Sequence, residues 1–350
     1  MEIFLNVPGG NCSLQGDFQY GFFTVTYSLV FTLGLPGNIL ALYYLCQSRQ
    51  RSRNANIYFV NLSTVDLIFI CLLPIRIYYH NAENNWIFGD MACRITGGLL
   101  YANIYLSIGF FTCISLDRYL AVVHPLMYVK IKCTRFSLIL TIVIWILCGA
   151  IILPLILGGP LGSGNGTKTT CFDGFSTSAW QDRLAPYNTC ALIFGFLLPF
   201  AITVVIMPLF ARRICRIKSS IHRKVALRII IFILVVSLVC FLPYNVSHLL
   251  YFMMKLDLIQ DCACAIYIYK LRRITLALVS LNSCLNPILI FIPYLSRRLC
   301  APCAKQTYHF QNKKPSDEAP KPITSPPPPP LPRKLEPVTI LGAKVEWSVL

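Results

Sequence analysis

Seven long apolar runs dominate this 350-residue chain and limit what it can fold into. Each is long enough to cross the roughly 30 Å hydrocarbon core of a bilayer, which takes about 20 residues of α-helix. Hydrophobic residues make up 56% of the chain and charged residues only 13%, too apolar for an ordinary water-soluble domain. We therefore predict an all-α membrane protein, a seven-transmembrane helix bundle with spans at 21–46, 56–79, 91–123, 136–157, 187–214, 225–254 and 271–294.

The positions of the basic residues predict the orientation, because Lys and Arg are retained in cytoplasmic loops. With the N-terminus outside, the cytoplasmic half carries the whole net charge of +17 and the outer half is neutral. This predicts an extracellular N-terminus at 1–20, a cytoplasmic C-terminus and a multi-pass protein of the plasma membrane. Glycosylation sequons at Asn11 and Asn165 fall on the outer side. The charge lies in short loops between apolar runs, which argues against a nucleic-acid partner.

Two further segments are predicted to follow the membrane domain at 21–294. Residues 295–304 are expected to form a short amphipathic helix 8 on the membrane, with Cys300 and Cys303 as palmitoylation sites. Residues 305–350 are proline-rich, which predicts a disordered cytoplasmic tail. The last three residues would suit the groove of a PDZ domain, which captures a free carboxylate by strand addition: Ser348, Val349 and Leu350.

Five of the 16 cysteines fall in the predicted outer segments, where disulfides can form. Cys93 starts the third span and Cys171 lies in the loop after the fourth, so these two are placed to bridge. Cys12 could pair with either Cys262 or Cys264, since connectivity does not follow from sequence alone.

Neither catalysis nor a resident cofactor is predicted. The five histidines form no metal-ligand cluster, and no pairing of a nucleophile with a base stands out. A transporter or channel is a remote alternative, because the chain has no internal repeat, no charged pore-lining series and an odd number of spans.

One acid lies inside a span, away from its ends. Inserting a charge near the bilayer centre costs about 2.5 to 3.5 kcal/mol of free energy on insertion scales. This acid is therefore expected to have polar neighbours on other helices. Polar residues of other spans can be placed around it, Asn38 among them, and their oxygens suit an allosteric Na⁺ with waters, or a proton. A hydrogen-bonded network that holds helices together is the alternative. The candidate sodium site comprises Asp66, Ser107, Asn282, Ser283 and Asn286.

Cations gather at the predicted outer ends of the spans. Guanidinium and ammonium groups there suit a phosphate or carboxylate head group, and tyrosines add aromatic walls. Ion pairs with nearby surface acids are the alternative, favoured for Lys255, Lys270 and Arg183. The candidate ligand-binding residues are Arg76, Tyr101, Tyr105, Arg183, Tyr244, His248, Lys255, Arg272 and Arg273.

The triplet Asp117-Arg118-Tyr119 ends an apolar stretch at 95–116 that contains no other charge. An arginine and an acid at one mouth of a membrane helix, with a cysteine at the other, suggest a switch rather than a packing core.

Taken in order, these residues resemble the class A, rhodopsin-like G-protein-coupled receptors. The resemblance runs through all seven spans and implies a receptor for an external ligand that activates heterotrimeric G proteins, with arrestin as a candidate further partner. It is carried by Gly37-Asn38, Asn61 through Leu67, Cys93, Asp117-Arg118-Tyr119, Trp145, Pro199, Cys240-Phe241-Leu242-Pro243 and Asn286-Pro287.

Finer features resemble the non-Edg lysophosphatidic acid receptors, a branch close to the purinergic receptors. These features are 85–90, 112–115, 171–175 with Trp180, and 241–245. The branch implies an acidic lysophospholipid ligand, most simply lysophosphatidic acid. It also implies disulfides Cys93–Cys171 and Cys12–Cys262, which leaves Cys264 free.

A nucleotide or another small acidic ligand is the alternative to a lysophospholipid. Nucleotide receptors of this broad group typically have a histidine where Asn245 stands, and only His248 fits their pattern here.

The switch departs from the family pattern. Many members have an acid at the foot of span six that holds the arginine, where this chain has Arg223, so Asp117 is the expected resting partner of Arg118. The positions that match the family's tyrosine partners are Met207 and Ile290.

Overall fold

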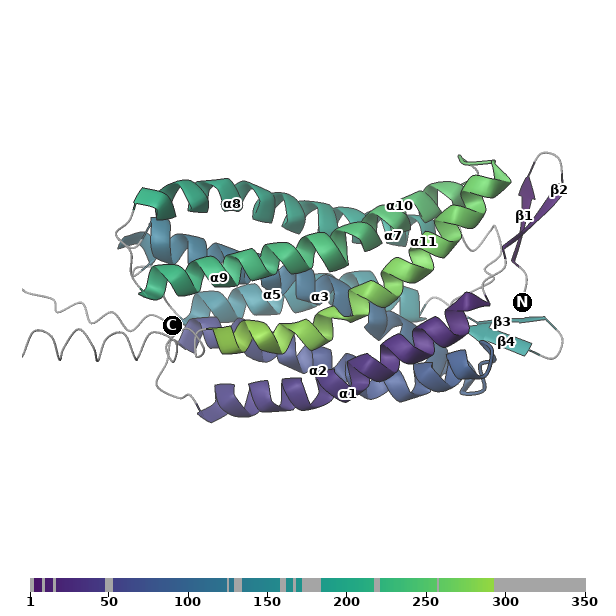
Figure 1. The fold of residues 1–350 in the computed structure, drawn as a ribbon, viewed down its shortest axis with the longest axis horizontal. Coiled ribbons are helices and arrows are strands. Elements are labelled where there is room, and N and C mark those ends of the chain that lie inside the picture. Colours follow the sequence, from purple (N-terminus) through teal and green to yellow (C-terminus); the bar gives the residue numbers. More distant parts are fainter. Residues whose placement is uncertain are drawn as a thin grey trace, which may run out of the picture.

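A computed structural model describes residues 3–7, 10–14, 17–47, 53–124, 126–128, 134–157, 162–165, 168–171, 184–216, 221–256 and 258–292. Its helices form the predicted bundle of seven spans (Figure 1). The first four are α1 (Phe18–Gln47), α2 (Arg53–Asn81), α3 (Gly89–Val123) and α5 (Thr134–Leu157). The fifth span combines α7 (Ala185–Leu192), η2 (Ile193–Leu197) and α8 (Leu198–Arg216). The sixth span combines α9 (Ile221–Val236), η3 (Ser237–Phe241) and α10 (Leu242–Lys255). The seventh span begins with α11 (Cys262–Ser280).

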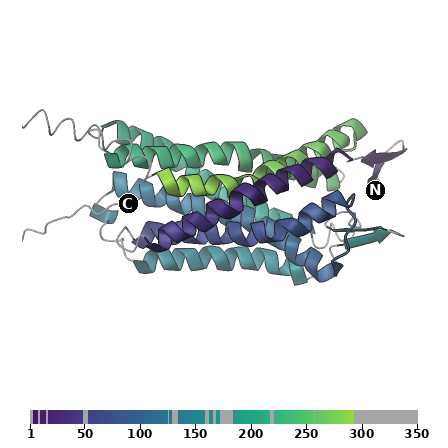
Figure 2. The same cartoon turned by 60° about the horizontal axis from the view of Figure 1, so that its bottom comes forward.

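Two short antiparallel hairpins, which the prediction of an all-α chain did not include, extend from one end of the bundle. They pair β1 (Ile3–Val7) with β2 (Gly10–Leu14) and β3 (Gly162–Asn165) with β4 (Lys168–Cys171). Figure 2 shows both at the same end, which we call the hairpin end.

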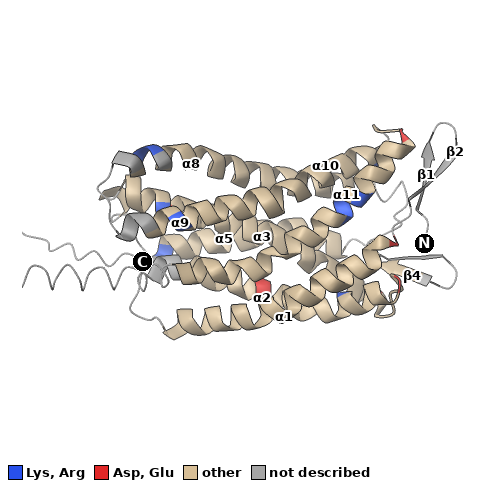
Figure 3. Ribbon diagram, in the orientation of Figure 1, with Lys and Arg blue, Asp and Glu red and all other residues tan. Residues whose placement is uncertain are grey.

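Helix α3 is the centre of the bundle. In its most apolar 18-residue stretch 83% of the residues are buried, compared with 22% in the span of α5. Large apolar side chains on α1, α5 and α8 are exposed, as expected of helix faces that meet lipid. Lys and Arg lie near the two ends of the bundle, with almost none between them (Figure 3).

Polar contacts join the helices inside this apolar shell. Asn38 Nδ2 donates to the carbonyl oxygen of Ser283 at 2.8 Å, which ties α1 to the seventh span. Trp145 Nε1 donates to Asn61 Oδ1 at 2.9 Å, which ties α5 to α2. Because hydrocarbon offers no competing partner, polar groups in the spans bond to one another.

The two π-helical segments each lie just before a proline. η2 ends two residues before Pro199 and η3 ends two residues before Pro243. Proline has no N–H to donate to the carbonyl four residues earlier, and a wider turn accommodates the missing bond.

The seventh span begins at Cys262, so its predicted start at residue 271 was wrong. The side chain of Asp261 caps the helix by accepting from the backbone N–H of Cys264 at 2.7 Å. Arg272 and Arg273, the predicted ligand residues on this helix, are buried in the bundle.

Several predictions fall outside the described residues: Arg183, Cys300, Cys303, helix 8 at 295–304 and the tail at 305–350. Only the backbone is described for Asn11, Cys12 and Asn165. The division of the chain into domains stays a prediction.

Gly195 in η2 provides a test of the packing between α3 and the fifth span. A Cβ there would lie 2.6 Å from Cδ1 of the Tyr105 ring. We expect Gly195→Ala to destabilise the protein by about 1 to 3 kcal/mol through overpacking, seen as a lower melting temperature in detergent. Gly149→Ala is the control, since a Cβ there meets nothing within 4 Å. Equal melting temperatures for the two variants would contradict this packing.

Candidate functional site

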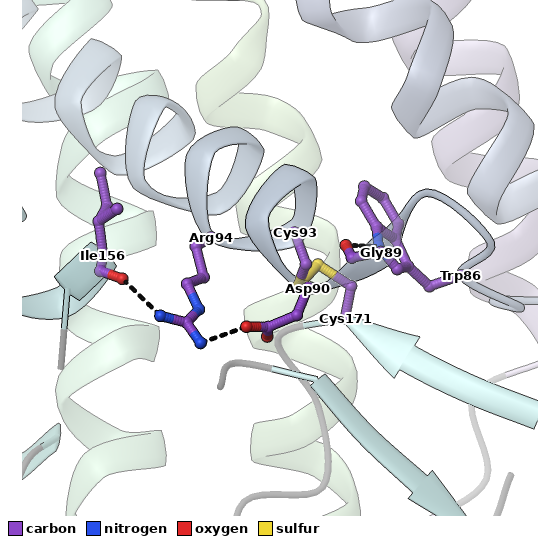
Figure 4. Close-up of polar contacts among 7 residues, drawn as sticks. All are labelled: Trp86, Gly89, Asp90, Cys93, Arg94, Ile156 and Cys171. Atoms are coloured by element: carbon purple, nitrogen blue, oxygen red, sulfur yellow. Dashed lines mark hydrogen bonds and ion pairs between the residues drawn. A yellow bond between two sulfur atoms is a disulfide. The ribbon is translucent and has the colours of Figure 1, made fainter. Parts of the chain in front are cut away.

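A disulfide and an arginine fix the hairpin end of α3. Cys93 is bonded to Cys171 on β4, and Arg94 pairs with Asp90 and donates to the carbonyl oxygen of Ile156 at 3.4 Å (Figure 4). That carbonyl is in the last turn of α5, where a cation is favourable. The first turn of α3 is thus held to β4 and α5 together.

Strand β4 is also bonded to α2. The hydroxyl of Tyr79 donates to the carbonyl oxygen of Cys171 at 3.5 Å, and the Cys171 N–H donates to that hydroxyl at 3.3 Å. The backbone N–H of Trp86 donates to the carbonyl oxygen of Thr169 at 2.7 Å. These bonds hold Cys171 over the mouth of the bundle.

Beneath Cys171 lies a small cavity of about 30 Å³, which we call the cation pocket. Three arginines line it, and none of the described lining residues is acidic. All three are buried, with 7 to 8% of each residue exposed. The lining comprises Phe23 and Tyr27 of α1, Arg76, Tyr79 and His80 of α2, Leu100 and Tyr101 of α3, Cys171, and Arg272, Arg273 and Leu276 of α11.

Arg272 connects four helices. Its Nη2 donates to the hydroxyl of Tyr101 at 3.2 Å, and its Nε lies 3.5 Å from His248 Nδ1. His248 Nε2 is in turn 3.0 Å from Asn188 Oδ1 on α7. The guanidinium also lies over the ring of Tyr251, 4.2 Å from its centre. The protein itself therefore supplies most of the partners of Arg272.

Arg76 is less well satisfied than Arg272. Its guanidinium lies 6.0 Å from the centre of the Trp86 ring. Its Nε and Nη2 are buried and have no hydrogen-bond partner among the described residues. Leaving a buried charged donor without an acceptor is costly, so Arg76 is the pocket residue best placed to receive an anion.

The other predicted ligand residues lie at different depths. Tyr244 is fully buried and stacks on His248, with ring centres 5.6 Å apart. Tyr105 is buried deeper on α3, against Gly195. Lys255 lies at the end of α10, near the ring of Tyr251.

The prediction omitted Tyr27, His80, Asn188 and Tyr251, which surround the arginines. Spacing could have indicated two of them: His80 lies one helical turn beyond Arg76, and Tyr251 lies three residues beyond His248. Tyr27 and Asn188 are on other helices, and no local pattern relates them to the arginines.

A second cavity, of about 560 Å³, lies between α5 and the fifth span, and we call it the apolar groove. Its lining is almost wholly apolar. The ring of Tyr187 also lies edge-on to Tyr101, 6.3 Å away, so it separates the groove from the interior. The groove is lined by Leu147, Ala150, Ile151, Pro154, Pro186, Tyr187, Cys190 and Phe194.

Asp66 is fully buried in the middle of the bundle. Its Oδ1 accepts from Ser283 Oγ at 2.7 Å and from Asn103 Nδ2 at 3.0 Å, and its Oδ2 accepts from Asn286 Nδ2 at 2.7 Å. Ser283 Oγ also lies 2.9 Å from Asn282 Oδ1. The prediction omitted Asn103, although it lies one helical turn before the predicted residue Ser107.

At the opposite end of α3, Arg118 is buried and forms an ion pair with Asp117, with Nη2 and Oδ2 3.6 Å apart. The hydroxyl of Tyr128 donates to the other Asp117 oxygen at 3.2 Å, a contact that sequence analysis missed. Burial and the negative charge of Asp117 raise the pKa of Tyr128 above its ordinary value, so this hydroxyl keeps its proton. The side chain of Arg223 lies outside those described.

The cysteines predicted to be extracellular divide as follows. Cys262 is disulfide-bonded, to a cysteine outside the described side chains, and Cys264 is a free, exposed cysteine. The partner predicted for Cys262 is Cys12.

The seven spans, the disulfide at the head of α3 and the arginine at its foot define a class of protein. The family model of the seven-transmembrane receptors of the rhodopsin family matches residues 37–290. This chain therefore belongs to that family, the rhodopsin-like G-protein-coupled receptors. The family consists of multi-pass membrane receptors and not enzymes. This confirms the predicted multi-pass membrane protein and the prediction that the chain is not an enzyme.

Individual relatives are more specific. The chain is 32% identical to lysophosphatidic acid receptor 6 of Gallus gallus, with 80% of this chain and 92% of the relative aligned. It is 34% identical to human lysophosphatidic acid receptor 4, over 80% and 76% of the two chains. It is 36% identical to human cysteinyl leukotriene receptor 2, over 82% of each. The predicted branch is confirmed by this set of relatives.

The ion pair at the foot of α3 leads to a prediction. Asp117→Asn keeps an acceptor for Tyr128 but removes the charge that holds Arg118, so we expect basal signalling to rise about 2- to 5-fold, from a pair worth about 0.5 to 1 kcal/mol. Basal nucleotide exchange on G protein in membranes, at matched receptor expression, measures it.

Tyr128→Phe is the companion variant, because it removes only the hydrogen bond and should raise basal signalling less. Unchanged basal signalling in Asp117→Asn would show that this pair does not restrain the receptor.

Proposed function

We propose that this protein is a cell-surface receptor for an acidic lipid, most simply lysophosphatidic acid or a related lysophospholipid, and that it signals through heterotrimeric G proteins. The observation that carries the proposal is the cation pocket, where Arg76, Arg272 and Arg273 are buried together with no acid among the described lining residues. Guanidinium groups bind phosphate and carboxylate oxygens in pairs, which suits an anionic head group.

The apolar groove supports a lipid over a wholly polar ligand. Its volume of about 560 Å³ is within the range of small-molecule sites, and only the ring of Tyr187 stands between it and Tyr101 of the cation pocket. An acyl chain in the groove would bury apolar surface, while the head group would lie with the arginines. The cation pocket has only about 30 Å³, so ligand binding would require it to widen.

Two alternatives concern the head group. The relative named for cysteinyl leukotrienes supports a carboxylate-bearing lipid as the second candidate. A nucleotide fits less well, because Asn245 is turned to its own helix and donates to the carbonyl oxygen of Phe241 at 2.8 Å.

The predicted orientation, with an extracellular N-terminus, places the end of the bundle that carries Arg118 in the cytoplasm. The proposed intracellular partners would therefore bind at that end. A G protein would engage the end that carries Arg118, and arrestin and a PDZ-domain protein remain candidate partners there. Tags at the two termini, tested for antibody access on intact cells, check the orientation.

An allosteric Na⁺ is proposed at Asp66. Besides its carboxylate, the oxygens of Ser107 and Asn286 are buried without a hydrogen-bond partner among the described residues, and all are ligands that suit this ion.

A ligand panel tests the proposed function. Cells that express the chain are challenged with lysophosphatidic acids of different acyl length, lysophosphatidylserine, cysteinyl leukotrienes and nucleotides, and calcium and Rho reporters are read. A response to acidic lipids alone is expected. A response to nucleotides alone would overturn the proposal.

Arg76 provides the sharpest test of the head-group site. Arg76→Gln removes a charge-assisted bond worth about 1.5 to 3 kcal/mol, so the concentration for half-maximal response should rise about 10- to 100-fold. Lys270→Gln is the matched control, because it removes the same charge from an exposed position on α11. Equal losses in the two variants would point to long-range electrostatics instead of a site at Arg76.

The sodium proposal predicts a cation-specific stability. With chloride held constant, replacing choline by Na⁺ should raise the melting temperature, since a ligand at ten times its Kd contributes about 1.4 kcal/mol. Asp66→Asn should remove the difference between the two cations. A difference that survives in Asp66→Asn would place the ion elsewhere.

A further inference from the structure

The cation pocket poses an electrostatic problem in the absence of ligand. Arg76 is buried and two of its nitrogens have no hydrogen-bond partner among the described residues. Arg272 and Arg273 line the same small space, so each guanidinium repels the others there. Charges buried without compensation cost several kcal/mol each, which the folded protein must offset.

The neutral groups around the pocket offset part of this cost. Arg272 has Tyr101, His248 and Tyr251 as partners, and Arg273 lies over the ring of Tyr269, 5.0 Å from its centre. Trp86, the aromatic neighbour of Arg76, lies at the longer distance of 6.0 Å. The least compensated charge is therefore the one on α2.

The size of the cavity limits what could supply the missing charge. The volume of about 30 Å³ has room for a water molecule or a monoatomic ion. A phosphate monoester or a carboxylate with its substituents is larger than this. A water could accept hydrogen bonds from Arg76, but it is neutral and would add no negative charge to the pocket.

We propose that the cation pocket binds a single chloride ion when no ligand is present, with Arg76 as its principal donor. The ion accepts from the unpartnered N–H groups of Arg76 and is held by the positive potential of Arg272 and Arg273. An anionic head group that enters the pocket displaces it. The resident ion thus stabilises the unliganded receptor and competes with the ligand, and its binding does not depend on which acidic ligand the receptor recognises.

Thermal melting of the purified full-length receptor in detergent, without added lipid, tests this proposal. With Na⁺ and ionic strength held constant, replacing gluconate by chloride should raise the melting temperature by about 2 to 4 °C, saturably. Bromide should substitute for chloride, and gluconate is too large for the cavity. Equal melting temperatures in chloride and gluconate would refute the site.

Variants assign the effect to the pocket. Arg76→Gln should abolish the chloride dependence, whereas Arg135→Gln, which removes an exposed charge at the start of α5, should keep all of it. Should Arg76→Gln fail to fold, Arg76→Lys retains the charge with fewer donors and should need about tenfold more chloride. A chloride effect undiminished in either Arg76 variant would overturn the assignment.

A signalling measurement separates this proposal from the proposed function. Replacing gluconate by chloride should raise the half-maximal concentration of an acidic lipid agonist and leave the maximal response unchanged, as expected of competition. Absence of any lipid response, with the chloride effect on melting intact, would count against the lipid ligand alone. A lipid response that chloride does not shift would count against the shared pocket.

Discussion

The hydrocarbon interior of the bilayer is the constraint on which the whole structure depends. It offers no hydrogen-bond partner, so every polar group within a span must find one inside the bundle. The result is a molecule with its polar residues on the inside, gathered at three depths around α3. The arginines of the cation pocket lie beside Cys171 near the hairpin end, Asp66 lies midway along α2, and Arg118 lies near the far end of α3.

Each of these three sites includes residues of α2 or α3. Arg76 and Asp66 are both on α2, while Tyr101, Asn103 and Arg118 are on α3. The disulfide at Cys93 and the arginine beside it hold the head of α3 in place. The π turns before Pro199 and Pro243 put local irregularity in the two spans that pack around this central helix. Such irregular turns are where a helix can change its pitch with the least loss of bonding.

Much of the fold could be predicted from the sequence, because the length and composition of a membrane span are set by the bilayer rather than by tertiary detail. The start of the seventh helix could not. The helix begins nine residues earlier than predicted, at Cys262, where the side chain of Asp261 caps it. Arg272 and Arg273 lie farther along it, against a histidine and two tyrosines. Asn103 and Tyr128 were missed for another reason: each becomes significant only when a second element supplies its partner. Local patterns predict which residues face inward, but not which of them meet.

The early start of α11 has a mechanical consequence. From Cys262 to Arg272 the chain is one continuous helix, which at 1.5 Å per residue is a rod about 15 Å long. Its first turn is anchored by a disulfide and its inner part carries two arginines of the cation pocket. A tilt of this rod at its anchored end would therefore displace the two arginines that line the cation pocket. The disulfide at Cys262 would then be the fixed point of that tilt.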